Sequence, residues 1–300
     1  MSDQRAEQPD QLAIFEDQRP RMMGICYRIL GSVSDAEDVI QEAWFRWSGT
    51  DAAEIDNPEA FLTTVVSRLA LDRLRRVKAR REAYPGSWLP EPVAPDNDPL
   101  AAVELADSLS MALLVVLEAL SPLERAAFVL REVFQRPYPE VAAAIGREEP
   151  AVRQLVHRAR LRVDAGATRY QADRATHAEV VRQFLVACGT ADLDALLSVL
   201  APDVVVVSDG GGVTKAPLRP VHGRDKVTRL LLGIAAKVPP GTTYALEVFN
   251  GQLGVVARAD GRAVSAMAFT VAERRVQTLH VLVNPAKLTA LDAEHEVTLQ

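Results

Sequence analysis

Apolar residues of the segment 138–163 recur every three or four positions in two runs, and Gly146 separates the runs. Each run therefore predicts a helix, and glycine is the residue that most readily ends a helix in a left-handed conformation. The second helix starts at Glu148 or Glu149, with Pro150 near its first position, where a missing N–H costs little. Two helices joined in this way are typical of a helix-turn-helix, which reads DNA with its second helix.

The exposed face of that second helix is basic. Arginine and glutamine can make paired hydrogen bonds to base edges, and other polar side chains can hold phosphates. The candidate DNA contacts are Arg153, Gln154, His157 and Arg158. The alternative is a solvated basic face on an ordinary helical hairpin.

Helical periodicity also covers residues 11–83, where three helices are predicted. Ser34 and Glu37 have the spacing of a capping box, which would open the second of these helices. The third helix is expected from Glu59 to about Arg81.

Beyond residue 176 the pattern changes from helices to strands. Two helices, a short apolar strand, a turn of three glycines and one more helix precede a series of alternating runs. Asn-Gly and Asp-Gly dipeptides, which favour hairpins, join the first three of these runs. The predicted strands are residues 204–207, 242–250, 252–259, 262–272 and 275–283. This order predicts an α+β domain with a curved antiparallel sheet.

The chain as a whole is predicted to be multidomain, with two all-α helical domains followed by the α+β domain. A proline-rich segment without positive charge separates the two helical domains and is interpreted as a linker. The predicted parts are a first helical domain, 1–84, the linker, 85–106, a helix-turn-helix domain, 107–172, and the α+β domain, 173–300.

The formal net charge of −6 hides a strong segregation of charge along the chain. The second predicted helix is acidic, and the third carries seven basic residues against one acidic residue between positions 68 and 81. An acidic surface beside a basic one indicates two different partners.

Composition excludes several other classes of protein. The chain is 48% hydrophobic and 25% charged, and its two cysteines, Cys26 and Cys188, are too few for a disulfide framework or a cysteine-rich zinc site. No signal peptide or membrane-spanning run is recognisable, so we expect a cytoplasmic protein.

The first 170 residues resemble the extracytoplasmic-function sigma factors of bacteria, which consist of a sigma-2 and a sigma-4 domain. The resemblance rests on segments that occur in the family's order. These are Gly31-Ser-Val-Ser-Asp-Ala-Glu-Asp-Val-Ile-Gln-Glu-Ala-Trp44, Asn57-Pro-Glu-Ala-Phe-Leu62, Leu71-Asp-Arg-Leu-Arg-Arg76 and Leu120-Ser-Pro-Leu-Glu-Arg125. The remainder resembles the SnoaL-like domain that one subgroup carries, a cone-shaped fold.

The resemblance implies a site for each partner. The acidic helix would dock on core RNA polymerase through Asp35, Glu37, Asp38, Gln41 and Glu42. The basic helix would bind the −10 element of promoter DNA through Asn57, Phe61, Arg68, Arg73, Arg76 and Arg80. The helix-turn-helix candidates would meet the −35 element. A core role for Phe61 is the alternative to base contact.

Three motifs of the subgroup point to a regulatory contact within the chain. Their residues are Trp88, Leu89 and Pro90 of the linker, Asp209, Gly210, Gly211 and Gly212, and Asn284, Pro285 and Lys287 near the end. We expect the linker to dock on the cone near Asp209, because three glycines permit close backbone approach. Two positions depart from the usual pattern: the lysine after the glycines is displaced to Lys215, and Ala286 stands where an acidic residue is usual.

The expected function is that of an alternative sigma factor, controlled in cis by its C-terminal domain without a separate anti-sigma protein. The alternative is a one-component regulator that senses a small molecule and binds operators as a dimer. No catalytic residue, metal site or cofactor is expected, although Asp209, Tyr244 and His280 would be the candidates if the cone were an enzyme. A small-molecule ligand could occupy the cone, and the sign of the C-terminal effect stays open.

Overall fold

The computed structural model describes residues 11–94, 110–167, 172–190 and 192–292. The chain forms two compact units: Met1–Lys78 with Glu118–Leu161, and Ala79–Leu117 with Arg162–Gln300. The second half of the predicted linker, residues 95–106, lies outside the described residues. No described helix is long and apolar enough to cross a membrane.

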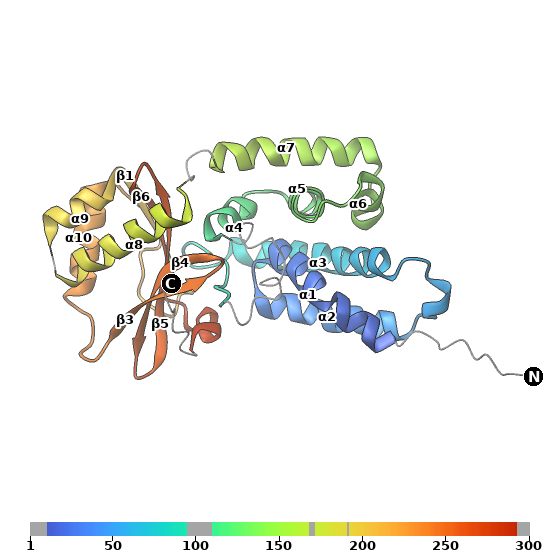
Figure 1. Cartoon of the computed structure of the whole chain (residues 1–300), viewed down its shortest axis with the longest axis horizontal. Coiled ribbons are helices and arrows are strands. Elements are labelled where there is room, and N and C mark those ends of the chain that lie inside the picture. The colour runs from blue at the N-terminus through green and yellow to red at the C-terminus, as the bar shows by residue number, and fades with distance from the viewer. Residues whose placement is uncertain (1–10, 95–109, 168–171, 191, 293–300) are drawn as a thin grey trace, which may run out of the picture. The chain divides into compact units, whose positions relative to one another are not determined.

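The first three helices pack around one apolar core (Figure 1). They are α1 (Gln11–Leu30), α2 (Val33–Ser48) and α3 (Pro58–Glu82), with the short helix η1 (Ala52–Glu54) before α3. The fully buried Trp47 anchors this core, and its indole Nε1 donates a hydrogen bond to the carbonyl of Gln11 at 2.8 Å.

The capping box predicted from Ser34 and Glu37 is wrong. Helix α2 begins two residues earlier than such a box requires, and Ser32 caps it by accepting a hydrogen bond from the backbone N–H of Asp35. The sequence Ser32-Val-Ser34 offers two possible caps, and the positive φ of Gly31 ends α1 immediately before the first of them.

The helix-turn-helix forms as predicted. Its segments are α5 (Pro122–Phe128), the π-helical turn η4 (Val129–Val133), α6 (Tyr138–Ile145) and α7 (Glu149–Ala167), preceded by α4 (Met111–Glu118). Ser121 and Glu124 form the capping box that starts α5. Gly146 ends α6 with φ 64° and ψ 49°, the left-handed conformation that glycine adopts without strain.

The two helical parts of the first unit contact each other. Arg125 of α5 is 1% exposed and donates a hydrogen bond through its Nε to the carbonyl of Arg28 in α1 at 2.9 Å. Lys78 of α3 donates to the carbonyl of Leu120 at 2.9 Å. A backbone carbonyl that accepts from a buried guanidinium fixes the helix that carries it, so these contacts define the unit.

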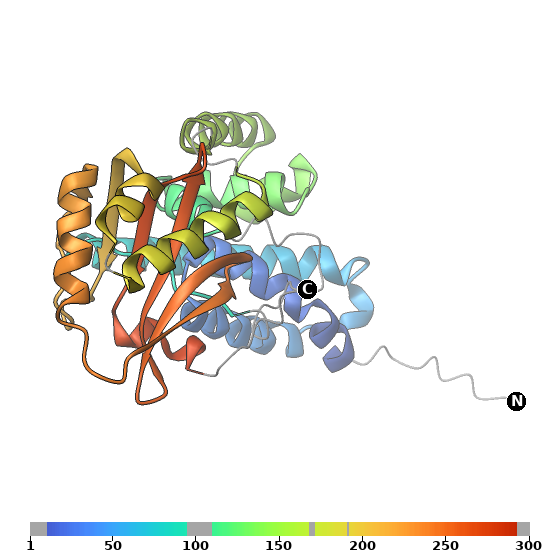
Figure 2. The ribbon, with the colours of Figure 1, turned by 60° about the vertical axis from the view of Figure 1, so that its left-hand side comes forward.

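The second unit is a six-stranded sheet with three helices on one face (Figures 1 and 2). The strand order is β2-β1-β6-β5-β4-β3. The strands are β1 (Leu200–Asp209), β2 (Val221–His222), β3 (Thr243–Phe249), β4 (Gln252–Ala259), β5 (Arg262–Ala272) and β6 (Arg275–Leu282). The helices are α8 (Arg174–Gly189), α9 (Leu193–Val199) and α10 (Arg224–Ala235). Their apolar sides and one sheet face form a core in which Phe184 meets Phe269 edge to face.

The sheet is mixed rather than purely antiparallel, which corrects one expectation. Strands β1 and β6 pair in parallel, because the chain between them is long enough to return through α10 and three strands. The two-residue strand β2 pairs with β1 and was not predicted, since its apolar pattern is too short to detect.

The other face of the sheet is covered by chain rather than left to solvent. Leu89, Ala94 and Met111 join a second core with residues of the sheet and with the turns η5 (Pro285–Lys287) and η6 (Thr289–Leu291). A backbone hydrogen bond also joins this segment to the sheet, because the N–H of Asn250 donates to the carbonyl of Val93 at 2.9 Å. The first half of the proline-rich segment is therefore part of a core.

Candidate nucleic-acid interface

The candidate contacts on α7 share one exposed face. Arg153, Gln154, His157 and Arg158 are all exposed, whereas the apolar residues that recur every three or four positions along the helix, such as Val152 and Val156, are buried. Arg153 lies over the ring of Tyr138 at 4.0 Å, and Arg131 lies over the same ring at 4.7 Å. Arg158 pairs at 3.0 Å with Glu124, which forms the capping box of α5 with Ser121. Intramolecular contacts thus orient both arginines before any DNA is bound.

The candidates on α3 have two different environments. Asn57 accepts a hydrogen bond from the N–H of Ala60 and so caps the helix. The ring of Phe61 is partly exposed and packs on Trp47 with 5.9 Å between ring centroids. Arg76 and Arg80 are exposed farther along the helix. Phe61 therefore packs against the core while it keeps an exposed edge.

Arg73 lies between α3 and the acidic helix α2. Its Nη2 is 2.6 Å from a carboxylate oxygen of Asp35 and 2.6 Å from one of Asp38. Partial burial lowers the pKa of Arg73, but the hydrogen bonds and charges of the two carboxylates outweigh burial and raise it overall. Two candidates for polymerase docking and one for DNA binding therefore form a single ion-pair cluster.

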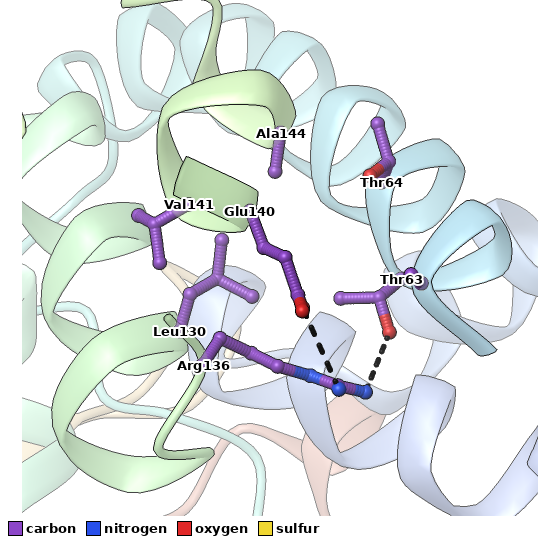
Figure 3. Close-up of a pocket in the computed structure, with 8 residues that line it drawn as sticks. Thr63, Thr64, Leu130, Arg136, Glu140, Val141 and Ala144 are labelled. Atoms are coloured by element: carbon purple, nitrogen blue, oxygen red, sulfur yellow. Dashed lines mark hydrogen bonds and ion pairs between the residues drawn. The ribbon is translucent and has the colours of Figure 1, made fainter. Parts of the chain in front are cut away.

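A second ion-pair cluster joins α3 to the helix-turn-helix. Glu59 pairs with Arg136 and, at 2.7 Å, with Arg21. Arg136 also donates to the hydroxyl of Thr63 at 3.3 Å and lies 3.6 Å from Glu140 of α6 (Figure 3).

Thr63, Arg136 and Glu140 line a hollow between α3 and α6 that is too small to enclose a water molecule (Figure 3). The Nε of Arg136 faces no hydrogen-bond partner among the described residues, although it is buried. Nearby, Arg68 of α3 donates to the carbonyl of Ala143 in α6 at 2.8 Å. The contact between the two DNA-binding helical parts is thus held by polar side chains, unlike the apolar cores on either side of it.

The motifs of the second unit meet at Asp209. Its side chain is fully buried and accepts hydrogen bonds from the hydroxyl of Tyr84 at 2.6 Å and the backbone N–H of Leu89 at 2.8 Å. Lys287 forms an ion pair with it at 2.7 Å and also donates to the carbonyl of Leu89. Asn284 completes the cluster by donating to the hydroxyl of Tyr84 at 2.9 Å. We call Tyr84, Leu89, Asp209, Asn284 and Lys287 the Asp209 cluster.

The three glycines after Asp209 leave no room for side chains. A Cβ on Gly211 would lie 2.5 Å from the Asn284 amide, and one on Gly212 would lie 2.8 Å from the ring of Pro85. Both residues also have positive φ, at 64° and 73°. The turn therefore needs glycine both for its backbone conformation and for the close approach of the linker.

The ring of Trp88 lies close to two cations. The guanidinium carbon of Arg81 is 3.3 Å from its ring centroid, and the ammonium of Lys287 is 4.0 Å away. Burial lowers the pKa of Lys287 and the charge of Asp209 raises it, with a net lowering. Lys215, the displaced lysine, is exposed, as is Ala286. Lys287 is thus the lysine that neutralises Asp209.

The three candidates for a catalytic cone do not share one face of the sheet. Asp209 pairs across the sheet with Leu282, and His280 with Ala268, and both partners belong to the core beneath the linker. Tyr244 pairs with Ala257 on the opposite face, near the helices. The geometry gives no support to a shared site of these three residues.

Acidification should destabilise the second unit through His280. Burial lowers the pKa of this histidine from 6.5 to about 4, and its Nδ1 has no hydrogen-bond partner among the described residues. Below pH 6.5 the unfolded chain binds a proton that the folded chain refuses, so stability present above pH 6.5 is lost as the pH falls toward 4. At about 1.4 kcal/mol per pH unit, the loss between pH 7 and pH 5 is about 2 kcal/mol.

Urea unfolding at several pH values measures this effect. His280→Gln should flatten the pH dependence, whereas His222→Gln, which changes an exposed histidine of β2, should leave it unchanged. An unaltered slope in His280→Gln would contradict the assignment.

Several residues of these clusters were missed from the sequence. Tyr84 and Arg81 immediately precede the linker motif, and Glu59 lies within a quoted segment, but their partners are distant in the chain. Arg136 precedes the predicted helix-turn-helix and Tyr138 begins it, and neither carries a local signal of pairing. The one sequence feature that could have indicated these residues is that each is a charged or aromatic residue in or beside a recognised motif.

Comparison with known proteins agrees with this arrangement. Residues 14–81 match the model of sigma-70 region 2, and residues 110–163 match that of sigma-70 region 4. The ECF RNA polymerase sigma factor SigJ of Mycobacterium tuberculosis is 43% identical over 92% of this chain and 92% of its own length. The probable ECF RNA polymerase sigma factor SigI of the same species is 33% identical over 94% of this chain and 96% of its own.

A solved structure extends the likeness to the fold. The crystal structure of M. tuberculosis SigJ superposes with a TM-score of 0.75 at 41% identity, covering 93% of this chain and 98% of that one. The match includes both helical parts and the C-terminal domain. The chain belongs to the extracytoplasmic-function family of RNA polymerase sigma factors.

Proposed function

We propose that this chain, an alternative sigma factor that directs transcription initiation, divides the work of promoter recognition among three helices. Helix α2 docks on core RNA polymerase through its acidic face, α3 holds the −10 element, and α7 reads the −35 element. The observation that carries the proposal is the segregation of exposed charge, acidic on α2 and basic on α7. Because its proposed partners, core polymerase and promoter DNA, are in the bacterial cytoplasm, the protein is proposed to act there.

On α7, Arg153 is the best candidate for reading a base. Its guanidinium is held by the ring of Tyr138 and by Glu149 at 3.3 Å, which reduces the entropy lost when it meets a base edge. A bidentate contact to a base is worth about 1–3 kcal/mol of discrimination.

Arg153→Ala should lower promoter binding and relax selectivity at one base pair of the −35 element. Binding to a panel of single-base promoter variants measures the selectivity. Arg182→Ala, which removes a partly exposed arginine from α8, is the matched control. Unchanged selectivity in Arg153→Ala would reassign the residue to phosphate contact.

Promoter engagement also requires the first unit to open. The −10 and −35 elements are about 25 base pairs apart, which corresponds to roughly 85 Å of duplex. Within the unit, however, Arg68 of α3 and Ala143 of α6 are joined by a hydrogen bond. While Arg68 donates to that carbonyl, part of its guanidinium is committed to α6 and fewer of its N–H groups are available to a phosphate. We therefore assign the observed contacts to a state that precedes promoter binding.

The Asp209 cluster is the proposed device for control in cis. It ties the chain that follows α3 to the C-terminal sheet, and so fixes the first part of the connection between the two DNA-binding parts, up to residue 94. Release of the cluster would lengthen that connection. Because the restraint is part of the same chain, a separate anti-sigma protein is not needed.

Control in cis then requires two states, a closed one in which the Asp209 cluster is formed and an open one in which it is released. To shift the protein from mostly closed to mostly open, a partner must bind the open state more tightly than the closed state by about 5.5 kcal/mol. Core polymerase is the proposed source of this energy, and a small-molecule ligand of the cone is the alternative source. Run-off transcription with purified core polymerase tests the proposed function, because a sigma factor alone confers promoter-specific initiation on that enzyme.

A further inference from the structure

The cluster of Arg73, Asp35 and Asp38 carries an inference that rests on the proposed docking of α2 on core polymerase. Four acidic side chains are assigned to that surface: Asp35, Glu37, Asp38 and Glu42. Arg73 already pairs with the first and third of these, and Arg46 pairs with Glu42 at 2.9 Å. Within the described parts of the chain, Glu37 alone of the four makes no ion pair. Three of the four carboxylates that a cationic partner would contact are therefore already paired with an arginine of the chain.

The geometry shows that Arg73 engages both carboxylates at once. Its Nε donates to one oxygen of Asp35 at 2.8 Å, while Nη2 reaches Asp35 and Asp38 at 2.6 Å each. The Asp38 side chain is 55% exposed, so an incoming basic surface can reach the same carboxylate. A guanidinium fixed beside it repels that surface, because two cations would share one anionic site.

We propose that Arg73 is a positioning residue that restrains α2 in the free protein, and that core polymerase displaces its guanidinium from Asp38 when it docks. The displaced side chain then becomes available to a phosphate of the −10 element. Polymerase binding and DNA binding are coupled through one arginine. The coupling is reciprocal, so DNA that captures Arg73 strengthens the hold of α2 on polymerase by the same factor.

A purely structural ion pair would behave in the opposite way. If Arg73 only supported the packing of α3 on α2, then its loss would loosen α2 and weaken the binding of polymerase. Under the proposal, its neutralisation frees negative charge on the docking face and strengthens binding. The sign of the change in affinity separates the two roles.

The experiment compares the full chain with Arg73→Gln and Arg75→Gln in titrations against purified core polymerase. Arg75 is the matched control, because it lies on the same helix and pairs with Asp72, an exposed residue of α3 itself. Arg73→Gln should bind about three- to tenfold more tightly at low salt, and the gain should shrink as salt rises. Arg75→Gln should bind like the unchanged chain.

A second readout follows the DNA. In the polymerase complex, Arg73→Gln should reduce the slope of log affinity against log salt for promoter DNA by about one. Arg75→Gln shows how much of that slope is lost when an arginine elsewhere on the same helix is removed. Equal or weaker polymerase binding by a folded Arg73→Gln protein would overturn the proposal.

If Arg73→Gln does not fold, Arg73→Lys replaces it, since a single ammonium cannot hold both carboxylates as the guanidinium fork does. It should bind polymerase about twofold more tightly, and unchanged or weaker binding would again overturn the proposal. Failure of the unchanged chain to bind core polymerase would instead contradict the proposed function.

Discussion

Replacing Asp209 with alanine should lower the free energy of unfolding of the second unit by about 3–5 kcal/mol. The substitution leaves the ammonium of Lys287, which is 7% exposed, without its carboxylate partner. It also removes the acceptor for the hydroxyl of Tyr84 and for the backbone N–H of Leu89. A buried charge that loses its partner is far more costly than the loss of an exposed pair.

Urea unfolding followed by circular dichroism measures the loss. Asp203→Ala is the matched control, because Asp203 lies on the same strand, β1, and is exposed. The linker should also become sensitive to proteolysis near Trp88 in the Asp209 variant. If Asp209→Ala and Asp203→Ala were equally stable, Asp209 would not be the anchor of the linker.

Replacing Arg136 with alanine should raise the affinity of the free protein for promoter DNA about tenfold to a hundredfold. Arg136 bridges Glu59 and Thr63 of α3 with Glu140 of α6, and its side chain is 12% exposed. Without it, Glu140 loses the ion-pair partner that the structure gives it, and Glu59 keeps only Arg21. The closed arrangement then loses stability relative to the open one that binds DNA.

The rise is unexpected for the loss of a cation, which ordinarily weakens DNA binding. Arg19→Ala is the control, since it removes an exposed arginine of α1 that pairs with Glu16 outside this cluster. Fluorescence anisotropy with a labelled promoter fragment measures both affinities. A fall in affinity for both variants would show that the α3–α6 contact does not restrain DNA binding.

The elements that repeat a local pattern were predictable from the sequence. The helix-turn-helix followed from periodicity, with Gly146 marking the end of its first helix. The strands after residue 242 followed from alternation and from two hairpin dipeptides. In each case the signal lies within a few residues of the structure that it specifies.

Long-range partners were not predictable in this way. Nothing near Arg73 indicates that Asp35 and Asp38 hold it, and nothing near β1 indicates a parallel partner in β6. Docking of the proline-rich segment near Asp209 was expected only from the motifs of the family resemblance and not from local spacing. Leu89 is 1% exposed, and Asp209, which accepts a hydrogen bond from its N–H, is more than 100 residues away in the chain. Such pairs depend on the folded topology and not on spacing.

The segregation of charge along the sequence indicated which helices are acidic and which are basic, but it did not indicate which side chains form ion pairs with one another. The acidic and basic helices were recognised from composition alone, but the structure pairs one with the other through Arg73. On α7, the predicted residues share one exposed face, and two of them are held by partners outside the helix.

The most direct test of the account is run-off transcription with purified core polymerase on selected promoter templates. It compares the full chain with a chain that ends near residue 170 and therefore lacks the sheet that holds Leu89. The account predicts promoter-specific transcripts that require the added protein, in amounts that differ between the two forms because the linker is released in one of them. No transcript from either form, together with binding to duplex DNA in the absence of polymerase, would contradict it and favour a one-component regulator.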